Sequence, residues 1–129
     1  MTLVVATGTF DLLHPGHVLY LERSKALGDE LVVIVARDVN VRHKAKPILP
    51  EEQRRRMIES LKPVDRAILG EVGDIFRTIE DLRPDIITLG FDQHFDPLRL
   101  EHDLFRRGLH PRIVRIEEQE PQAYRQQDP

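Results

Sequence analysis

Apolar runs alternate along this chain with stretches in which apolar residues recur at every third or fourth position. Unbroken apolar runs are typical of strands that are covered on both faces of a parallel sheet, whereas the spaced pattern is typical of amphipathic helices. The runs predict strands at residues 2–7, 31–36, 64–69, 85–89 and 112–116. The spaced stretches predict helices at residues 16–27, 50–61, 74–82 and 96–107.

Residues at the helix ends support these limits. Gly28 is suited to end the first helix, because glycine readily takes the left-handed conformation that follows a last turn. Asp74 can cap the third helix. In the fourth helix Asp96 is the expected N-cap and Pro97 the first helical residue, because proline needs no amide hydrogen there. The apolar side chains of this helix that are expected to face the core are Leu100, Leu104 and Phe105.

The fourfold alternation of strand and helix predicts an α/β fold, a Rossmann-like five-stranded parallel sheet with helices on both faces. Residues 1–116 are expected to form this domain, and the polar residues 117–129 a loosely ordered tail. Ligands of such sheets bind beyond the carboxyl ends of the strands, where the strand order reverses. The loops at residues 8–17, 38–50 and 90–95 leave carboxyl ends, so we expect them to meet around one crevice.

The composition narrows the possible functions. The 129 residues carry a net charge of −3, so no global positive charge favours a nucleic-acid or membrane partner. There is no cysteine, which excludes disulfides, thiolate metal ligands and a cysteine nucleophile. No apolar run approaches the roughly 20 residues of a membrane span, and the N-terminus lacks the pattern of a secretion signal. The cytoplasm is therefore the expected location.

Two histidines, His14 and His17, stand where the first predicted strand leads into the first predicted helix. The first turn of a helix presents unpaired backbone N–H groups and the positive end of the helix dipole, which favours bound anions. Two imidazoles at this place can donate hydrogen bonds to phosphate oxygens and stabilise charge that builds up during phosphoryl transfer. The same spacing could form half of a zinc site, but no third ligand follows at metal-like spacing.

The stretch from Gly8 to His17 resembles the signature of the cytidylyltransferase-like nucleotidyltransferases, in which Gly-Thr-Phe-Asp is followed by His-x-Gly-His. The resemblance implies that the two histidines bind a triphosphate and stabilise the pentacovalent α-phosphorus, with no covalent enzyme intermediate. It also implies a nucleotide-binding set, which consists of Thr9, Phe10, His14, Pro15, Gly16 and His17.

Four further segments resemble the archaeal FAD synthases, and this likeness extends over about residues 3–116. The segments are residues 35–38, 46–55, 62–65 and 84–93. The resemblance implies transfer of AMP from ATP to FMN with release of pyrophosphate. It implies a divalent metal cation such as Mg²⁺ as cofactor, the small molecules ATP and FMN as substrates, and a homodimer.

The same resemblance implies roles for residues beyond the histidine loop. Lys44, Lys46 and Arg54 match residues that contact phosphates in the family, and Lys44 and Arg54 join the two histidines as the catalytic set. Asp92 matches an acid on the nucleotide side of the site, although it could instead bind the metal or cap a turn. No metal ligand is assigned.

One expected part of the family pattern is missing. Relatives carry a segment rich in serine and threonine after the fifth strand, whereas this chain has neither residue after Thr88. Two alternatives therefore stay open. One is a cytidylyltransferase that acts on glycerol 3-phosphate or another small alcohol phosphate. The other is a nucleotide-binding domain that has lost catalysis.

Overall fold

A computed structural model describes residues 1–40, 49–74, 76–90 and 96–116 of the chain. Its strands are β1 (Leu3–Gly8), β2 (Glu30–Val35), β3 (Arg66–Leu69), β4 (Ile86–Leu89) and β5 (Arg112–Arg115). Its helices are α1 (Pro15–Lys25), α2 (Glu51–Glu59), α3 (Arg77–Leu82), α4 (Pro97–Phe105) and the short 3₁₀ helix η1 (Asp38–Asn40). Each predicted strand and α-helix is present within a few residues of its predicted limits.

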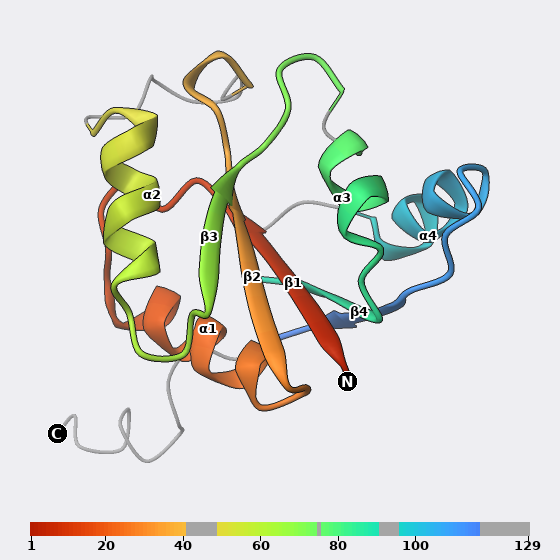
Figure 1. The fold of residues 1–129 in the computed structure, drawn as a ribbon, viewed down its shortest axis with the longest axis horizontal. Coiled ribbons are helices and arrows are strands. Elements are labelled where there is room, and N and C mark those ends of the chain that lie inside the picture. Colours follow the sequence, from red (N-terminus) through yellow and green to blue (C-terminus); the bar gives the residue numbers. More distant parts are fainter. Residues whose placement is uncertain (41–48, 75, 91–95, 117–129) are drawn as a thin grey trace, which may run out of the picture.

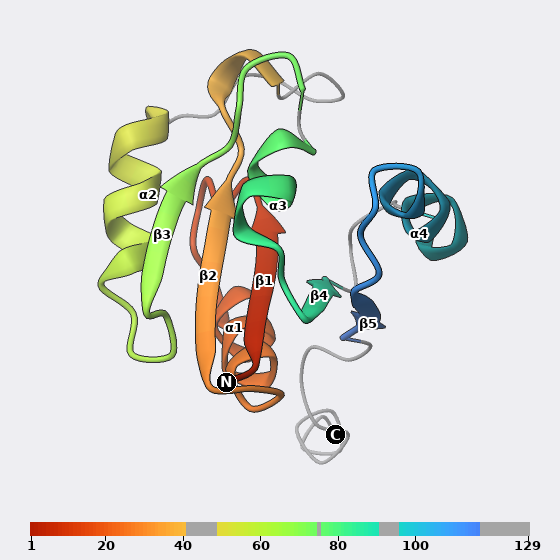
Figure 2. The ribbon, with the colours of Figure 1, turned by 45° about the vertical axis from the view of Figure 1, so that its right-hand side comes forward.

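The five strands form one parallel sheet in the order β3-β2-β1-β4-β5. The central strand β1 places Val5 beside Val32 of β2 on one side and beside Ile87 of β4 on the other. From β1 the chain builds outward to β2 and β3, then crosses back to add β4 and β5 on the other side (Figures 1 and 2). The order therefore reverses between β1 and β4, and ligands of open parallel sheets bind at the carboxyl ends beside such a reversal.

Helices cover both faces of this sheet, as the alternation predicts (Figures 1 and 2). Alternate strand residues point to opposite faces, so Val4 and Val5 belong to two different apolar cores. Val4 packs in the core with Leu21 of α1 and Ile58 of α2. Val5 packs in the other with residues of α3 and α4 such as Leu104. The Rossmann-like α/β fold is confirmed.

Two details differ from the sequence prediction. Phe105 was expected to face the core, but it is 62% exposed and its ring packs edge-on against His110 with 5.0 Å between ring centroids. Leu100 and Leu104, four residues apart, form the buried stripe of α4, and Phe105 lies about 100° further round the helix.

Gly28 does not cap α1, because Ala26 is its C-cap. A Cβ at Gly28 would instead lie 2.7 Å from Val4 Cγ2, so glycine permits close packing there.

The predicted helix caps are partly confirmed. The Asp96 carboxylate accepts a hydrogen bond from the Leu98 N–H at 3.0 Å, and Pro97 opens α4, as expected. Asp74 accepts from the Phe76 N–H at 3.0 Å, but α3 begins only at Arg77. Asp74 therefore fixes the turn that leads into α3 and is not its N-cap. Among the described residues, no helix is both long and apolar enough to cross a membrane.

A carboxylate outside the core fastens the end of α1 to the sheet, and this contact depends on pH. Asp65 accepts from Lys25 Nζ at 2.6 Å and from the Leu31 N–H at 2.8 Å. These two bonds, the Lys25 bond first, lower the pKa of Asp65 below its usual 3.8. The ionised form therefore stabilises the fold above about pH 3.8, and this contribution is lost as the pH falls through the lower pKa of the folded state.

We expect Asp65→Asn to lower the free energy of unfolding at pH 6 and to approach wild-type stability as the pH falls below 3.8. Urea unfolding at a series of pH values measures this difference. Asp81→Asn is the matched control, since the Asp81 side chain is 66% exposed and lies 3.7 Å from Arg77. A destabilisation by Asp65→Asn that is the same at every pH would contradict the prediction.

Candidate active site

The first turn of α1 is capped by two histidines. His14 is the N-cap residue, and its Nδ1 accepts a hydrogen bond from the Gly16 N–H at 3.1 Å. His17 reaches back, and its Nδ1 accepts from the His14 N–H at 3.4 Å. A capping box commonly pairs Ser or Thr with Glu or Gln, but here imidazoles fill both positions.

This cap determines which nitrogen of each ring carries a proton. A ring nitrogen that accepts a hydrogen bond has no proton, so in each neutral imidazole the proton resides on Nε2. Nε2 lies across the ring from the capped backbone. The two rings are stacked, with 3.8 Å between centroids and 29° between planes. The arrangement therefore brings two N–H donors close together at a helix N-terminus, where anions are favoured.

Phe10 fixes the loop that leads from β1 to this cap. Its backbone is left-handed, with φ of 54°, and its side chain is buried. The Phe10 ring lies edge-on to the His17 ring with 5.4 Å between centroids. A Cβ at Gly8 would come within 2.6 Å of Phe10 Cζ, so this position needs glycine for the ring to fit. Gly8 and Phe10 of the motif therefore help to hold the His17 ring in place by packing.

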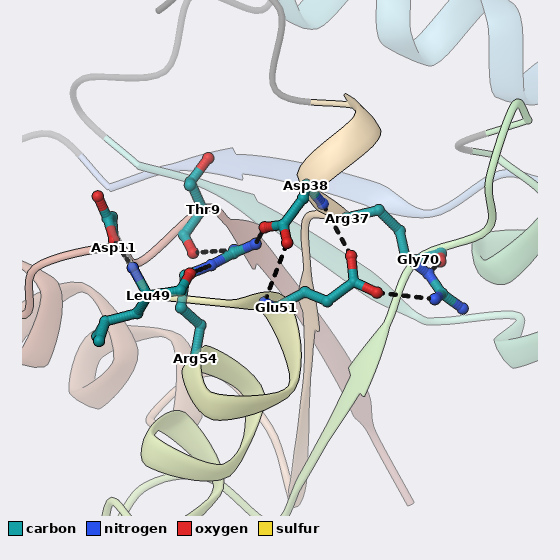
Figure 3. A network of polar contacts seen from close by, with 8 residues as sticks. All are labelled: Thr9, Asp11, Arg37, Asp38, Leu49, Glu51, Arg54 and Gly70. Carbon is teal, nitrogen blue, oxygen red and sulfur yellow. Dashed lines mark hydrogen bonds and ion pairs between the residues drawn. The ribbon is translucent and has the colours of Figure 1, made fainter. Parts of the chain in front are cut away.

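Arg54 ties this loop to the neighbouring strands (Figure 3). Its side chain is fully buried, and each of its three side-chain nitrogens donates a hydrogen bond. Nη1 donates to the Thr9 carbonyl at 2.7 Å and Nε to the Leu49 carbonyl at 2.9 Å. Nη2 pairs with Asp38 Oδ1 at 2.5 Å. One guanidinium therefore joins the loop after β1, the segment after β2 and the start of α2.

A second group of contacts extends the hydrogen-bond network of Arg54 toward β3 (Figure 3). The Asp38 N–H donates to Glu51 at 2.9 Å, and the Glu51 N–H donates to Asp38 at 3.4 Å. Arg37 pairs with Glu51 at 3.1 Å and donates to the Gly70 carbonyl at 2.7 Å. Gly70 directly follows β3, so the network connects the carboxyl ends of β1, β2 and β3.

The structure brings together several of the site residues that the sequence predicts. His14, His17 and the intervening Pro15 and Gly16 form the start of α1, with Thr9 and Phe10 in the loop before it. Arg54 contacts the same loop through the Thr9 carbonyl. The other predicted site residues, Lys44, Lys46 and Asp92, lie outside the described residues.

The prediction that Arg54 contacts phosphates is not tested by this arrangement, which gives the guanidinium three protein acceptors. Sequence reasoning did not single out Asp38, the carboxylate that pairs with Arg54, or Glu51, which contacts Asp38 and Arg37. The signal was weak, because these residues are spaced far from the histidine motif and resemble ordinary surface acids.

Comparison with known proteins identifies the family of the chain. A family model described as "Cytidylyltransferase-like" matches residues 5–124. The chain belongs to the cytidylyltransferase-like family. The predicted resemblance is thereby confirmed, and so is its class, a nucleotidyltransferase.

The curated relatives of this family member include a protein named "FAD synthase" from Methanothrix thermoacetophila. It is 65% identical over 121 residues, which cover 94% of this chain and 85% of the relative. A "FAD synthase" from Archaeoglobus profundus is 62% identical over 96% of this chain and 80% of its own length. The predicted likeness to archaeal FAD synthases is therefore confirmed.

A solved structure titled as the lipopolysaccharide core biosynthesis protein from Thermoplasma volcanium is 50% identical, with a TM-score of 0.89. It matches 93% of this chain, and the match covers 99% of that structure. A protein of unknown function from Archaeoglobus fulgidus, 19% identical with a TM-score of 0.71, shares the fold.

We expect Arg54→Ala to lower the free energy of unfolding by about 3 kcal/mol or more, because it leaves Asp38 and two carbonyls without their buried donor. Chemical denaturation without ligand measures this. The matched control is Arg56→Ala on the same helix, where the side chain is exposed and a change within about 0.5 kcal/mol is expected. If the two variants were equally stable, Arg54 would not hold the loops together.

Proposed function

We propose that this chain is a FAD synthase, which transfers AMP from ATP to FMN and releases pyrophosphate. The single observation that carries this proposal is the 65% identity to a protein named "FAD synthase" over 94% of the chain. The doubly capped histidine turn supports it, because it offers hydrogen-bond donors at a helix N-terminus to a polyphosphate.

The proposed step is an in-line displacement at the α-phosphorus of ATP. A phosphate oxygen of FMN forms the new bond to this phosphorus, and the bond to the oxygen that bridges the α- and β-phosphates breaks. The electron pair of that bond leaves with pyrophosphate. Catalysis then depends on positioning and on stabilising charge at the phosphate oxygens, because no covalent protein intermediate is formed.

His14 and His17 stabilise the charge that develops in this step. Each ring uses Nδ1 for the helix cap, so Nε2–H is the donor that can face a phosphate oxygen. The bonds become stronger as charge grows on the phosphorus oxygens and the leaving group, which lowers the barrier. Pro15 and Gly16 bring the backbone of the first turn to the phosphates, and Thr9 and Phe10 contact the nucleotide.

The remaining predicted roles rest on family likeness. Lys44 and Lys46 bind phosphates, and Asp92 lies on the nucleotide side of the site. Arg54 belongs to the same machinery, but its described contacts indicate that it acts by holding the Thr9 carbonyl. The homodimer stays a prediction, which sedimentation of the purified chain tests.

The divalent cation is proposed to enter the site already bound to the phosphates of ATP. Over residues 1–40, 49–74, 76–90 and 96–116, no group of three or more His, Cys, Asp or Glu side chains could hold a metal ion. Asp11 accepts from the Leu49 N–H at 3.0 Å, and Asp38 pairs with Arg54, so both nearby acids have protein partners. Mg²⁺ often binds through substrate phosphates and keeps several waters, and it needs no protein cage for this.

A substrate panel tests the proposed reaction. We expect pyrophosphate release and FAD formation with ATP and FMN, and neither with CTP and glycerol 3-phosphate. Release with CTP and glycerol 3-phosphate instead would favour the cytidylyltransferase alternative. Binding of ATP without turnover would favour the domain that has lost catalysis.

Variants of the two histidines test their roles. We expect His17→Ala to lower kcat by about 10²–10³, the usual effect of removing a donor that stabilises transition-state charge. His14→Ser is expected to lower kcat as well, while its hydroxyl keeps the N-cap and therefore most of the stability. His102→Ala, an exposed histidine on α4, is the control and keeps full turnover. Unchanged turnover in His17→Ala would remove this residue from the catalytic set.

A further inference from the structure

A cluster of hydroxyl groups lies buried between α1 and the sheet. Tyr20 and Ser24 come from α1, one helical turn apart, and Thr88 comes from β4. Tyr20 is 5% exposed, and Ser24 and Thr88 are fully buried. The surroundings are apolar, since Tyr20 belongs to the same core as Val4, Leu21 and other aliphatic side chains. Buried polar groups of this kind are uncommon unless they are fully hydrogen-bonded.

The hydrogen bonds of the cluster connect all three hydroxyls. Ser24 Oγ donates to the Tyr20 carbonyl at 2.8 Å, and it also lies 2.8 Å from Thr88 Oγ1. Thr88 Oγ1 in turn donates to the Tyr20 hydroxyl at 3.2 Å. The Tyr20 hydroxyl donates to the Thr88 carbonyl at 2.9 Å and accepts from the Thr7 N–H at 3.2 Å. Every hydroxyl proton of the cluster therefore has an acceptor.

The position of the cluster relates it to the active site. Thr7 lies near the carboxyl end of β1 and Thr88 near that of β4, and these two strands flank the reversal of strand order. The Tyr20 hydroxyl bonds to the backbone of both. Tyr20 also follows His17 by three residues on α1, so it connects the helix that carries the histidines with the two strands beside the proposed crevice.

We propose that Tyr20 is a positioning residue for the nucleotidyl transfer, acting together with Ser24 and Thr88. This inference rests on the function proposed above. Apolar packing is non-directional and tolerates small shifts of a helix along a sheet, whereas hydrogen bonds have short, directed geometry. The Tyr20 hydroxyl fixes how far the first turn of α1 stands from β1 and β4. It thereby sets the distance between the histidine donors and a phosphate held at the reversal.

The test compares variants that remove or keep the hydroxyl groups. Tyr20→Phe and Thr88→Val remove them with little change in volume, and Thr88→Ser keeps one. We expect the first two to lower kcat about tenfold or more, because shifts of about 1 Å can reduce a rate by about 10²-fold. The KM for ATP is expected to change by less, since the donors act most strongly in the transition state. Thr88→Ser is expected to stay close to wild-type kcat.

A control and a second readout make the outcomes distinct. Leu104→Val creates a small cavity in the core on the opposite face of the sheet, and it is expected to lower stability without lowering kcat. Crystal structures of Tyr20→Phe and Thr88→Val are expected to show α1 displaced relative to β1, and this readout needs no turnover. Wild-type protein that is inactive with ATP and FMN would overturn the proposed function, and the position of α1 would still test the inference. Variants with wild-type kcat, or with an undisplaced α1, would overturn the inference.

Discussion

The candidate site depends on one buried positive charge, the guanidinium of Arg54. A charged group without access to water is strongly destabilising unless it is paired and hydrogen-bonded, so its partners must be held in place. Here those partners come from three separate segments, namely Thr9 after β1, Asp38 after β2 and Leu49 before α2. Movement of Asp38 away from Arg54 would leave the charge unpaired, and movement of Thr9 or Leu49 would leave a buried N–H without its acceptor. The three segments therefore form one cooperative unit.

The histidine turn is connected to that unit through the loop after β1. Arg54 holds the Thr9 carbonyl, and the next residue, Phe10, packs its ring against His17. One turn further along α1, Tyr20 fastens the helix to β1 and β4. The two imidazoles are therefore held from the loop before them and from the helix behind them. Such preorganisation is what an active site without a covalent intermediate requires, because its rate depends on fixed donors at fixed distances.

The sequence predicted the features that arise from local patterns. Long apolar runs such as residues 31–36 indicated buried parallel strands, and Asp96 with Pro97 indicated the start of α4. Phe105 follows the buried Leu104 and lies at the border of the apolar stripe of α4. The spacing of apolar residues alone could not decide whether a side chain at that border faces the core or the solvent. The family resemblance singled out Arg54 from its run of three arginines as a phosphate contact, but it did not predict that Arg54 is buried. Its burial follows from acceptors distant in the sequence, which only the fold brings together.

The central claim is that His14 and His17 bind the phosphates, whereas Arg54 holds the surrounding loops in place. A crystal structure of the chain with a non-hydrolysable ATP analogue and FMN tests this claim most directly. The predicted result is a triphosphate at the first turn of α1, within hydrogen-bond distance of Nε2 of His14 and His17, and Arg54 still bonded to the Thr9 carbonyl. A structure in which Arg54 leaves Thr9 to contact a phosphate, or in which the triphosphate lies away from both histidines, would contradict it.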